Sequence, residues 1–157
     1  MRLLGNIVWL ILGGWVLFLT YTVAAIIFFP LFIPLFRLAR YALWPFGRGL
    51  VTQSQLIKYR EIKSIESKEH LLGSTARQIS GVLNILWMLT FGWFLALVHL
   101  CSAIFNMFLF FLIVTIPNIG GHWKLIRVAF MPFNKVIVPQ SIADEINKEL
   151  VKNKLNI

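Results

Sequence analysis

The chain contains an internal repeat, and this repeat restricts its fold more than any other feature. Five short motifs in residues 6–46 recur in the same order in residues 84–133. They are Asn-Ile-x-Trp, Gly-Trp, a single proline, Arg/Lys-Leu-x-Arg-x-Ala and Pro-Phe. The offset is 78 residues up to the Gly-Trp pair and 87 from the proline onward, so the second copy holds nine more residues in its middle. Such a chain is expected to build two similar units.

Each copy contains a long apolar stretch without Asp, Glu, Lys or Arg, Leu3–Phe36 in the first and Val82–Ile116 in the second. As one helix, either stretch would reach roughly 50 Å, well beyond a hydrocarbon core of about 30 Å. The first stretch is therefore expected to be a hairpin with short arms, or one tilted span ending near Phe29 and followed by an interfacial helix over about Leu31–Leu43. Pro30 and Pro34 suit both alternatives because proline interrupts helical hydrogen bonding.

Composition places the chain among membrane proteins. Hydrophobic residues make up 59% of it and charged residues only 13%, about half the usual share in soluble domains. The net charge of +9 lies in blocks outside the apolar stretches, which favours an anionic lipid surface over nucleic acid as the acidic partner. The N-terminus resembles a secretory signal, but apolarity resumes through residue 36, so we expect a retained membrane element.

The basic residues predict the sidedness of the chain. Eight Lys and Arg residues fall between the two apolar stretches and the rest, apart from Arg2, follow the second, so both polar regions are expected in the cytoplasm. An even number of crossings then separates them, which predicts a hairpin in the second repeat and, by analogy, in the first. Arms of about 16 residues reach roughly 24 Å, and such a mismatch is relieved by local thinning, re-entrant penetration or oligomerisation. Because a unit with four such arms also buries little of its own surface, we expect a homo-oligomer.

The expected fold is an all-α integral membrane protein with two tandem repeats, each a short transmembrane or re-entrant helical hairpin. Four regions follow: a first membrane repeat over residues 1–48, a cytoplasmic linker over 49–82, a second membrane repeat over 83–135 and a cytoplasmic tail over 136–157. The protein is expected to be a multi-pass protein of the bacterial inner membrane, with linker and C-terminus in the cytoplasm.

Three local features are predicted outside the apolar stretches. A helix over Gln55–Leu72 ends at Gly73, and an amphipathic C-terminal helix begins at a capping box of Ser141 and Asp144. Leu50-Val51 and Ile137-Val138 follow the matched prolines at the same distance, and we expect them to pair as a short two-stranded ladder.

Two groups of polar residues are candidate sites. The first group consists of cations that recur at the same offset, which predicts snorkelling at the interface or sites for anions or anionic lipid headgroups: Arg37, Arg40, Lys124 and Arg127. The second group consists of uncharged residues near the apolar stretches, a candidate polar lining: Asn6, Asn84, His99, Ser102 and Asn106. The two asparagines are alternatively helix caps. The other three form a hairpin tip or a stripe on one helix face, where they would make interhelical hydrogen bonds.

The sequence contains few groups suited to chemistry. All six carboxylates lie in the linker or tail, the three histidines have no partner at metal-ligand spacing, and the single Cys101 excludes an intrachain disulfide. No nucleophile motif such as Gly-x-Ser-x-Gly occurs. We therefore expect no enzyme, no cofactor and no metal.

The repeated motifs resemble a known family. Arg40–Arg48 reads Arg-Tyr-Ala-Leu-Trp-Pro-Phe-Gly-Arg and Phe91–His99 reads Phe-Gly-Trp-Phe-Leu-Ala-Leu-Val-His. Both are similar to motifs of the YccF family of bacterial inner-membrane proteins, which consist of two inner-membrane component domains. The resemblance covers about residues 5–48 and 83–135, although the second unit closes with Phe130–Asn134 and lacks the tryptophan and glycine of the motif. It implies an integral inner-membrane location and no established reaction or substrate.

Two functions remain. The first is an oligomeric channel or permease in which hairpins surround a path and the cations favour small anions. The alternative is a non-transporting membrane module that binds anionic lipid or docks partner proteins.

Overall fold

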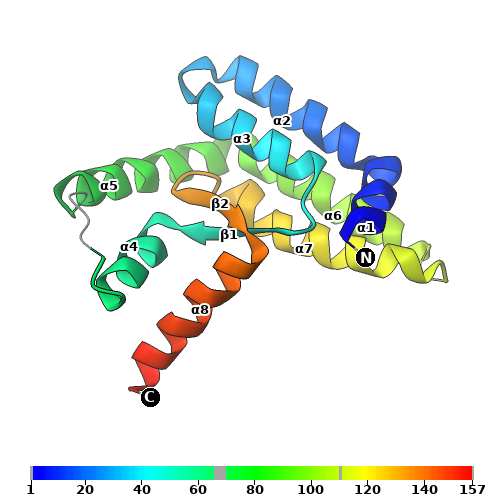
Figure 1. Cartoon of the computed structure of the whole chain (residues 1–157). Coiled ribbons are helices and arrows are strands. Elements are labelled where there is room, and N and C mark those ends of the chain that lie inside the picture. The colour runs from blue at the N-terminus through cyan, green and yellow to red at the C-terminus, as the bar shows by residue number, and fades with distance from the viewer. Residues whose placement is uncertain (1, 66–69, 110, 157) are drawn as a thin grey trace. The chain divides into compact units, whose positions relative to one another are not determined.

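The computed structural model describes residues 2–65, 70–109 and 111–156 of the 157-residue chain (Figure 1). It is mostly helical, with one small sheet. Contacts divide the chain into two compact units, each built from two segments that are distant in sequence. Unit 1 comprises Met1–Phe46 and Asn84–Pro132, and unit 2 comprises Gly47–Leu83 and Phe133–Ile157.

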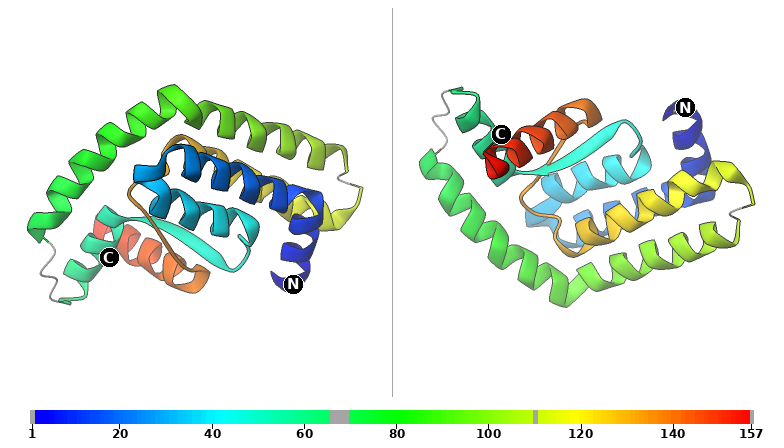
Figure 2. Two further views of the ribbon diagram at one scale, coloured as in Figure 1. Left: turned by 90° about the horizontal axis from the view of Figure 1, so that it is seen from above. Right: turned by 90° about the horizontal axis from the view of Figure 1, so that it is seen from below.

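The first half of unit 1 is a helical hairpin. Helix α1 (Arg2–Trp9) continues through a π-helical turn (Leu10–Gly14) into α2 (Trp15–Ile27), with a kink at Gly13, whose φ is 131°. A short 3-10 turn follows, and α3 (Phe32–Leu43) runs back along α2 (Figures 1 and 2). The outgoing arm and the returning arm thus pack against each other.

The second half of unit 1 repeats this order. The end of helix α5 (His70–Trp87), from Asn84 onward, a π-helical turn (Met88–Gly92) and α6 (Trp93–Phe108) lead to a 3-10 turn. Helix α7 (Ile116–Phe130) then packs along α6 (Figure 2). The π-helical turns are 78 residues apart, and α2 and α6 begin at equivalent positions. The nine extra residues of the second copy therefore lengthen the end of α6, the turn and the start of α7.

The conserved order of Trp and Gly within the two copies has a packing cause. The indole Nε1 of Trp9 donates to the carbonyl of Ala42 at 2.7 Å, and that of Trp87 donates to the carbonyl of Ala129 at 2.8 Å. Both indoles are almost fully buried. In each copy the glycine five residues later leaves room for the indole. The same bond therefore ties the outgoing arm to the returning arm in both hairpins.

Unit 2 contains the sheet, helices α4 and α8, and the first part of α5. Strands β1 (Arg48–Thr52) and β2 (Lys135–Pro139) pair antiparallel, so the expected two-stranded ladder is confirmed. Its register places Leu50 opposite Ile137 and Val51 opposite Val136. Helices α4 (Gln53–Ile62) and α8 (Gln140–Leu155) cover a small apolar core.

Polar contacts join α4 to α8 at the surface of unit 2. The hydroxyl of Tyr59 donates to Glu145 Oε1 at 2.6 Å, and Lys63 Nζ lies 3.4 Å from Glu149 Oε2. The bond to Glu145 raises the pKa of Tyr59, and the bond from Lys63 is the main cause that lowers the pKa of the Glu149 carboxyl. Since these groups are exposed, we attribute the packing of the two helices mainly to the apolar core.

Two expected helix boundaries in unit 2 are wrong. The linker helix expected over Gln55–Leu72 ends at Ile62, and Gly73 lies inside α5 instead of ending a helix. The C-terminal helix begins after Pro139 without a side-chain cap, so Ser141 and Asp144 do not form the expected capping box. A complete capping box occurs instead at α4, between Thr52 and Gln55. At the start of α8 the backbone N–H of Gln140 instead donates to the carbonyl of Gly47 at 3.0 Å, which satisfies one of the free N–H groups of the first turn.

Two helices of the described chain are long and apolar enough to cross a membrane. They are Arg2–Ile27 and Arg77–Phe108, and less than a third of the most apolar window of each is buried. Their exposed apolar side chains would be costly in water, whereas lipid would cover them without cost.

Candidate functional site

The four recurring cations lie on the exposed faces of the two returning helices. Arg37 and Arg40 belong to α3, whereas Lys124 and Arg127 belong to α7. The opposite faces of these helices are buried against α2 and α6. Arg40 and Arg127 occupy the last turns of their helices, where the helix dipole favours a positive charge.

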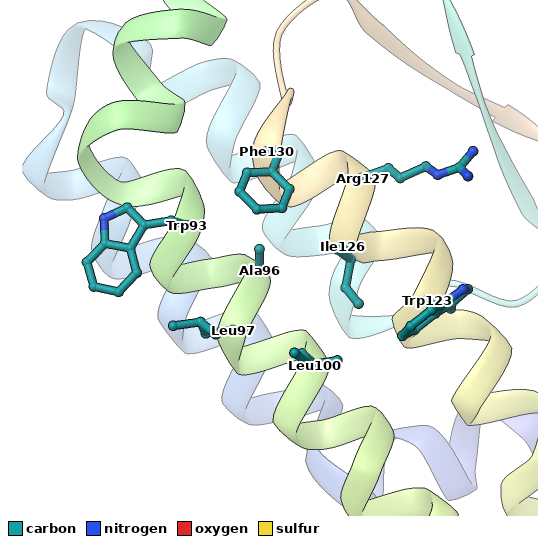
Figure 3. A pocket seen from close by; sticks show the side chains of 8 residues that line it. All are labelled: Trp93, Ala96, Leu97, Leu100, Trp123, Ile126, Arg127 and Phe130. Atoms are coloured by element: carbon teal, nitrogen blue, oxygen red, sulfur yellow. The ribbon is translucent and has the colours of Figure 1, made fainter.

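An apolar groove of about 600 Å³ runs between α6 and α7. Its lining residues come from these two helices alone: Trp93, Ala96, Leu97, Leu100, Trp123, Ile126, Arg127 and Phe130. Figure 3 shows Ala96, Leu100 and Ile126 along the middle of the groove and Phe130 towards one end. Arg127 is the charged residue among them, and its side chain extends from α7 away from α6 (Figure 3).

The polar residues of α6 form a stripe, not the tip of a hairpin. His99 and Asn106 are fully buried, and the turn lies beyond Phe108. The hydroxyl of Tyr21 lies 3.2 Å from His99 Nε2, and His99 Nδ1 lies 3.3 Å from His122 Nδ1. Ser102 donates to the carbonyl of Val98 within its own helix.

The three rings form a continuous hydrogen-bonded chain inside unit 1. When Tyr21 donates to His99 Nε2, His99 Nδ1 donates to His122, since a neutral imidazole carries one donor and one acceptor. Reversing both bonds makes the Tyr21 hydroxyl an acceptor and leaves its own proton unpaired within this chain of rings. The ring of His122 stacks on Trp9 with centroids 4.3 Å apart. Among the described residues, no three His, Cys, Asp or Glu side chains are grouped closely enough to hold a metal ion.

A second pair of buried polar residues joins α6 and α7 near the turn. Asn118 donates to Asn106 Oδ1 at 3.2 Å, and Asn106 donates to the carbonyl of Ser102 at 2.8 Å. Asn118 Oδ1 is buried without a hydrogen-bond partner. Asn118 follows the matched proline and corresponds to Leu31 at the offset of 87 residues, so the first hairpin has an apolar side chain at this position.

The two repeated asparagines lie within helices, so their interpretation as helix caps is wrong. Asn6 lies in α1 and bonds to the backbone of Phe46 twice: its amide donates to the Phe46 carbonyl and its oxygen accepts from the Phe46 amide, both at 3.0 Å. Asn84 lies in α5, fourteen residues after its start, and is half-buried. Asn6 therefore ties the beginning of the first hairpin to its end.

The YccF family, described as an inner membrane component domain, matches the chain twice, over residues 4–48 and 82–135. The chain belongs to the YccF family. Two curated relatives carry the name inner membrane protein YccF, one from Escherichia coli (strain K12) and one from Shigella flexneri. Each is 26% identical to the chain over 144 residues, which cover 88% of both sequences. No solved structure matches the chain.

The structure adds two elements within the matched YccF domains to the sequence-predicted site. One is the link from Tyr21 to His99, whose separation of 78 residues equals the offset of the repeat and was therefore a usable signal. The other is the groove of the second domain, whose key residue, Ala96, has no polar or aromatic group that would have singled it out.

Proposed function

We propose that the protein is a non-enzymatic component of the bacterial inner membrane whose two inserted hairpins bind anionic lipid headgroups through the cations of α3 and α7. One observation supports this most: exposed cations occupy the same place in both returning helices, outside the packed hairpin interior. A role confined to one hairpin would not need the arrangement twice.

Both ends of each hairpin would lie on one side of the membrane. The bonds from Asn6 to Phe46 and from Trp9 to Ala42 hold the two ends of the first hairpin together. The bond from Trp87 to Ala129 does the same in the second. The basic segments that follow the hairpins favour the cytoplasmic side.

The returning helices favour re-entrant insertion over full crossing. Helix α3 has 12 residues and α7 has 15, which correspond to roughly 18 and 22 Å, short of a hydrocarbon core of about 30 Å. The cations near their C-terminal ends would then lie close to the cytoplasmic headgroups, where phosphate is available as a partner.

A channel for small anions has weaker support. The candidate lining residues His99 and Asn106 are fully buried and hydrogen-bonded within one chain, so a hydrated path would require these contacts to open. A path between copies of a homo-oligomer remains the other form of this hypothesis. Its signature would be a defined ring of four or more subunits that conducts.

The test is the loss of bound anionic lipid in a double variant, Arg40→Gln with Arg127→Gln. A basic residue near an anionic surface contributes about 1 kcal/mol, so two replacements should weaken binding of phosphatidylglycerol roughly thirtyfold. Native mass spectrometry of the purified protein, titrated with phosphatidylglycerol and with zwitterionic phosphatidylcholine, measures this and reports the subunit number.

The matched control removes two exposed lysines of unit 2, Lys58→Gln with Lys148→Gln. It changes the net charge equally and should leave lipid binding unchanged. An equal loss in both double variants, or no loss in either, would contradict the proposal.

A further inference from the structure

We propose that the groove between α6 and α7 holds one acyl chain of an anionic phospholipid whose phosphate is bound by Arg127. This inference rests on the proposed function and goes beyond it in two respects. It assigns a chain-binding site, and it restricts that site to the second hairpin.

The size and lining of the groove suit a hydrocarbon chain. Its volume of about 600 Å³ falls within the usual range of small-molecule sites, roughly 300–1,000 Å³. Seven of the eight lining residues are apolar, and Ala96 and Leu100 of α6 face Ile126 of α7 across it (Figure 3). The groove therefore offers contact area to a chain but no hydrogen bond along its length.

In the first hairpin, aromatic side chains fill the space that corresponds to the groove of the second. The repeat offset makes Phe18 the counterpart of Ala96, and Phe36 the counterpart of Trp123. The rings of Phe18 and Phe36 contact each other, with centroids 6.2 Å apart. In the second hairpin, alanine at this position leaves the space between the helices open.

Charge determines which lipid the groove would select. Bilayer hydrocarbon is as apolar as the groove, so exchanging one apolar surrounding for another supplies little free energy. The guanidinium of Arg127 points away from α6, so a phosphate outside the groove could reach it while the chain lies inside (Figure 3). The expected ligand is therefore an anionic phospholipid, because its phosphate and net charge complement Arg127.

The exposed tryptophans support a position near the membrane interface. Trp93 is 50% exposed and Trp123 is 65% exposed, and both line the groove. Tryptophan is enriched at the level of the headgroups, where its ring is partly in hydrocarbon and its N–H can reach water or phosphate. A lipid with its head at Arg127 would have its headgroup at this level.

The experiment fills the groove by the substitution Ala96→Phe, because the first hairpin has phenylalanine, Phe18, at the equivalent position. Its control is Ile104→Phe, which enlarges an exposed side chain of the same helix outside the groove. Native mass spectrometry with phosphatidylglycerol should show a loss of the most tightly retained lipid for Ala96→Phe, up to about the fivefold loss that removal of Arg127 would cause, because a chain excluded from the groove no longer places its phosphate at Arg127. Ile104→Phe should show no loss. Ala96→Leu adds a smaller side chain and should cause an intermediate loss of bound phosphatidylglycerol. It replaces Ala96→Phe as the test if the phenylalanine variant does not fold.

The outcomes separate this inference from the proposed function. If Arg127→Gln weakens phosphatidylglycerol binding while both folded Ala96 variants bind as the unchanged protein does, the headgroup site stands and the groove assignment is overturned. If Ala96→Phe instead dissociates an oligomer without releasing lipid, a second copy of the chain occupies the groove and the inference is also overturned. If neither the arginine nor the alanine variants change lipid binding, both proposals fail.

Discussion

At the scale of single residues, the Gly-Trp motif is explained by a close approach within each hairpin. A Cβ atom on Gly92 would lie 2.9 Å from Cδ1 of Trp87, and one on Gly14 would lie even closer to Trp9. Each indole is held in place by its bond to a backbone carbonyl of the returning helix. The glycine is therefore required by the indole five residues before it, not by its own backbone conformation.

We predict that Gly14→Ala destabilises the protein, because the added methyl group collides with a ring that cannot move without breaking its hydrogen bond. Overpacking of this kind costs about 1–3 kcal/mol. The measurement is thermal unfolding in detergent, followed by circular dichroism.

The control for this prediction is Gly120→Ala, in the interior of α7, where nothing lies within 4 Å of the added Cβ. Here the better helix propensity of alanine should leave stability unchanged or raise it by up to about 1 kcal/mol. A Gly14→Ala protein that melts at or above the temperature of the unchanged protein would refute the packing argument.

At the scale of secondary-structure elements, the ladder between β1 and β2 shows what the sequence could and could not predict. Aliphatic pairs at matching distances after the two prolines were enough to predict the pairing of Leu50-Val51 with Ile137-Val138. The register places Val51 opposite Val136, not Val138, because the partner strand runs antiparallel and pairs Gly49 with Val138.

This register predicts a specific crosslink. In a Cys101→Ser background, Val51→Cys with Val136→Cys should form a disulfide readily, since direct partners in an antiparallel pair are about 4.5–5.5 Å apart. Val51→Cys with Val138→Cys should form it poorly, because that diagonal distance of about 7–8 Å is too long. The shift of the oxidised product on a non-reducing gel measures both, and a preference for the second pair would show that the strands slip by two residues.

Helix boundaries were harder to predict than helix existence. The sequence over Gln55–Leu72 contains residues compatible with one helix, yet the chain ends α4 at Ile62, where Ser64 adopts a positive φ of 54°. The helix was predicted to end at Gly73 because glycine is common just after helix C-termini. Glycine is also tolerated inside a helix, however, at a cost of only about 1 kcal/mol. The groove at Ala96 could not be predicted from the sequence, because it arises where the side chains of two packed helices leave space unfilled.

At the scale of the whole molecule, the internal repeat predicted more than any single motif. The offset of 78 residues anticipates the equivalent π-helical turns, and together with the offset of 87 after the proline it anticipates the equivalent Trp to Ala bonds. What the repeat could not predict is where the copies differ. Leu31 and Leu35 in the first copy correspond to the buried Asn118 and His122 in the second, so the returning helix of the second hairpin buries two polar side chains where the first has leucine.

The proposed insertion of both hairpins from the cytoplasmic side predicts a labelling pattern for single cysteines in a Cys101→Ser background. Lys58→Cys and Ser141→Cys, both in unit 2, should react with a membrane-impermeant maleimide only after the inner membrane of spheroplasts is opened. Phe29→Cys and Phe111→Cys, near the turns of the two hairpins, should stay unlabelled from the outside although both side chains are exposed in the isolated chain. The reason is length, since returning helices of roughly 18 and 22 Å place the turns inside a hydrocarbon core of about 30 Å. Labelling of either turn in intact spheroplasts would mean that the hairpin crosses fully, and labelling of Ser141→Cys there would reverse the orientation deduced from the basic residues.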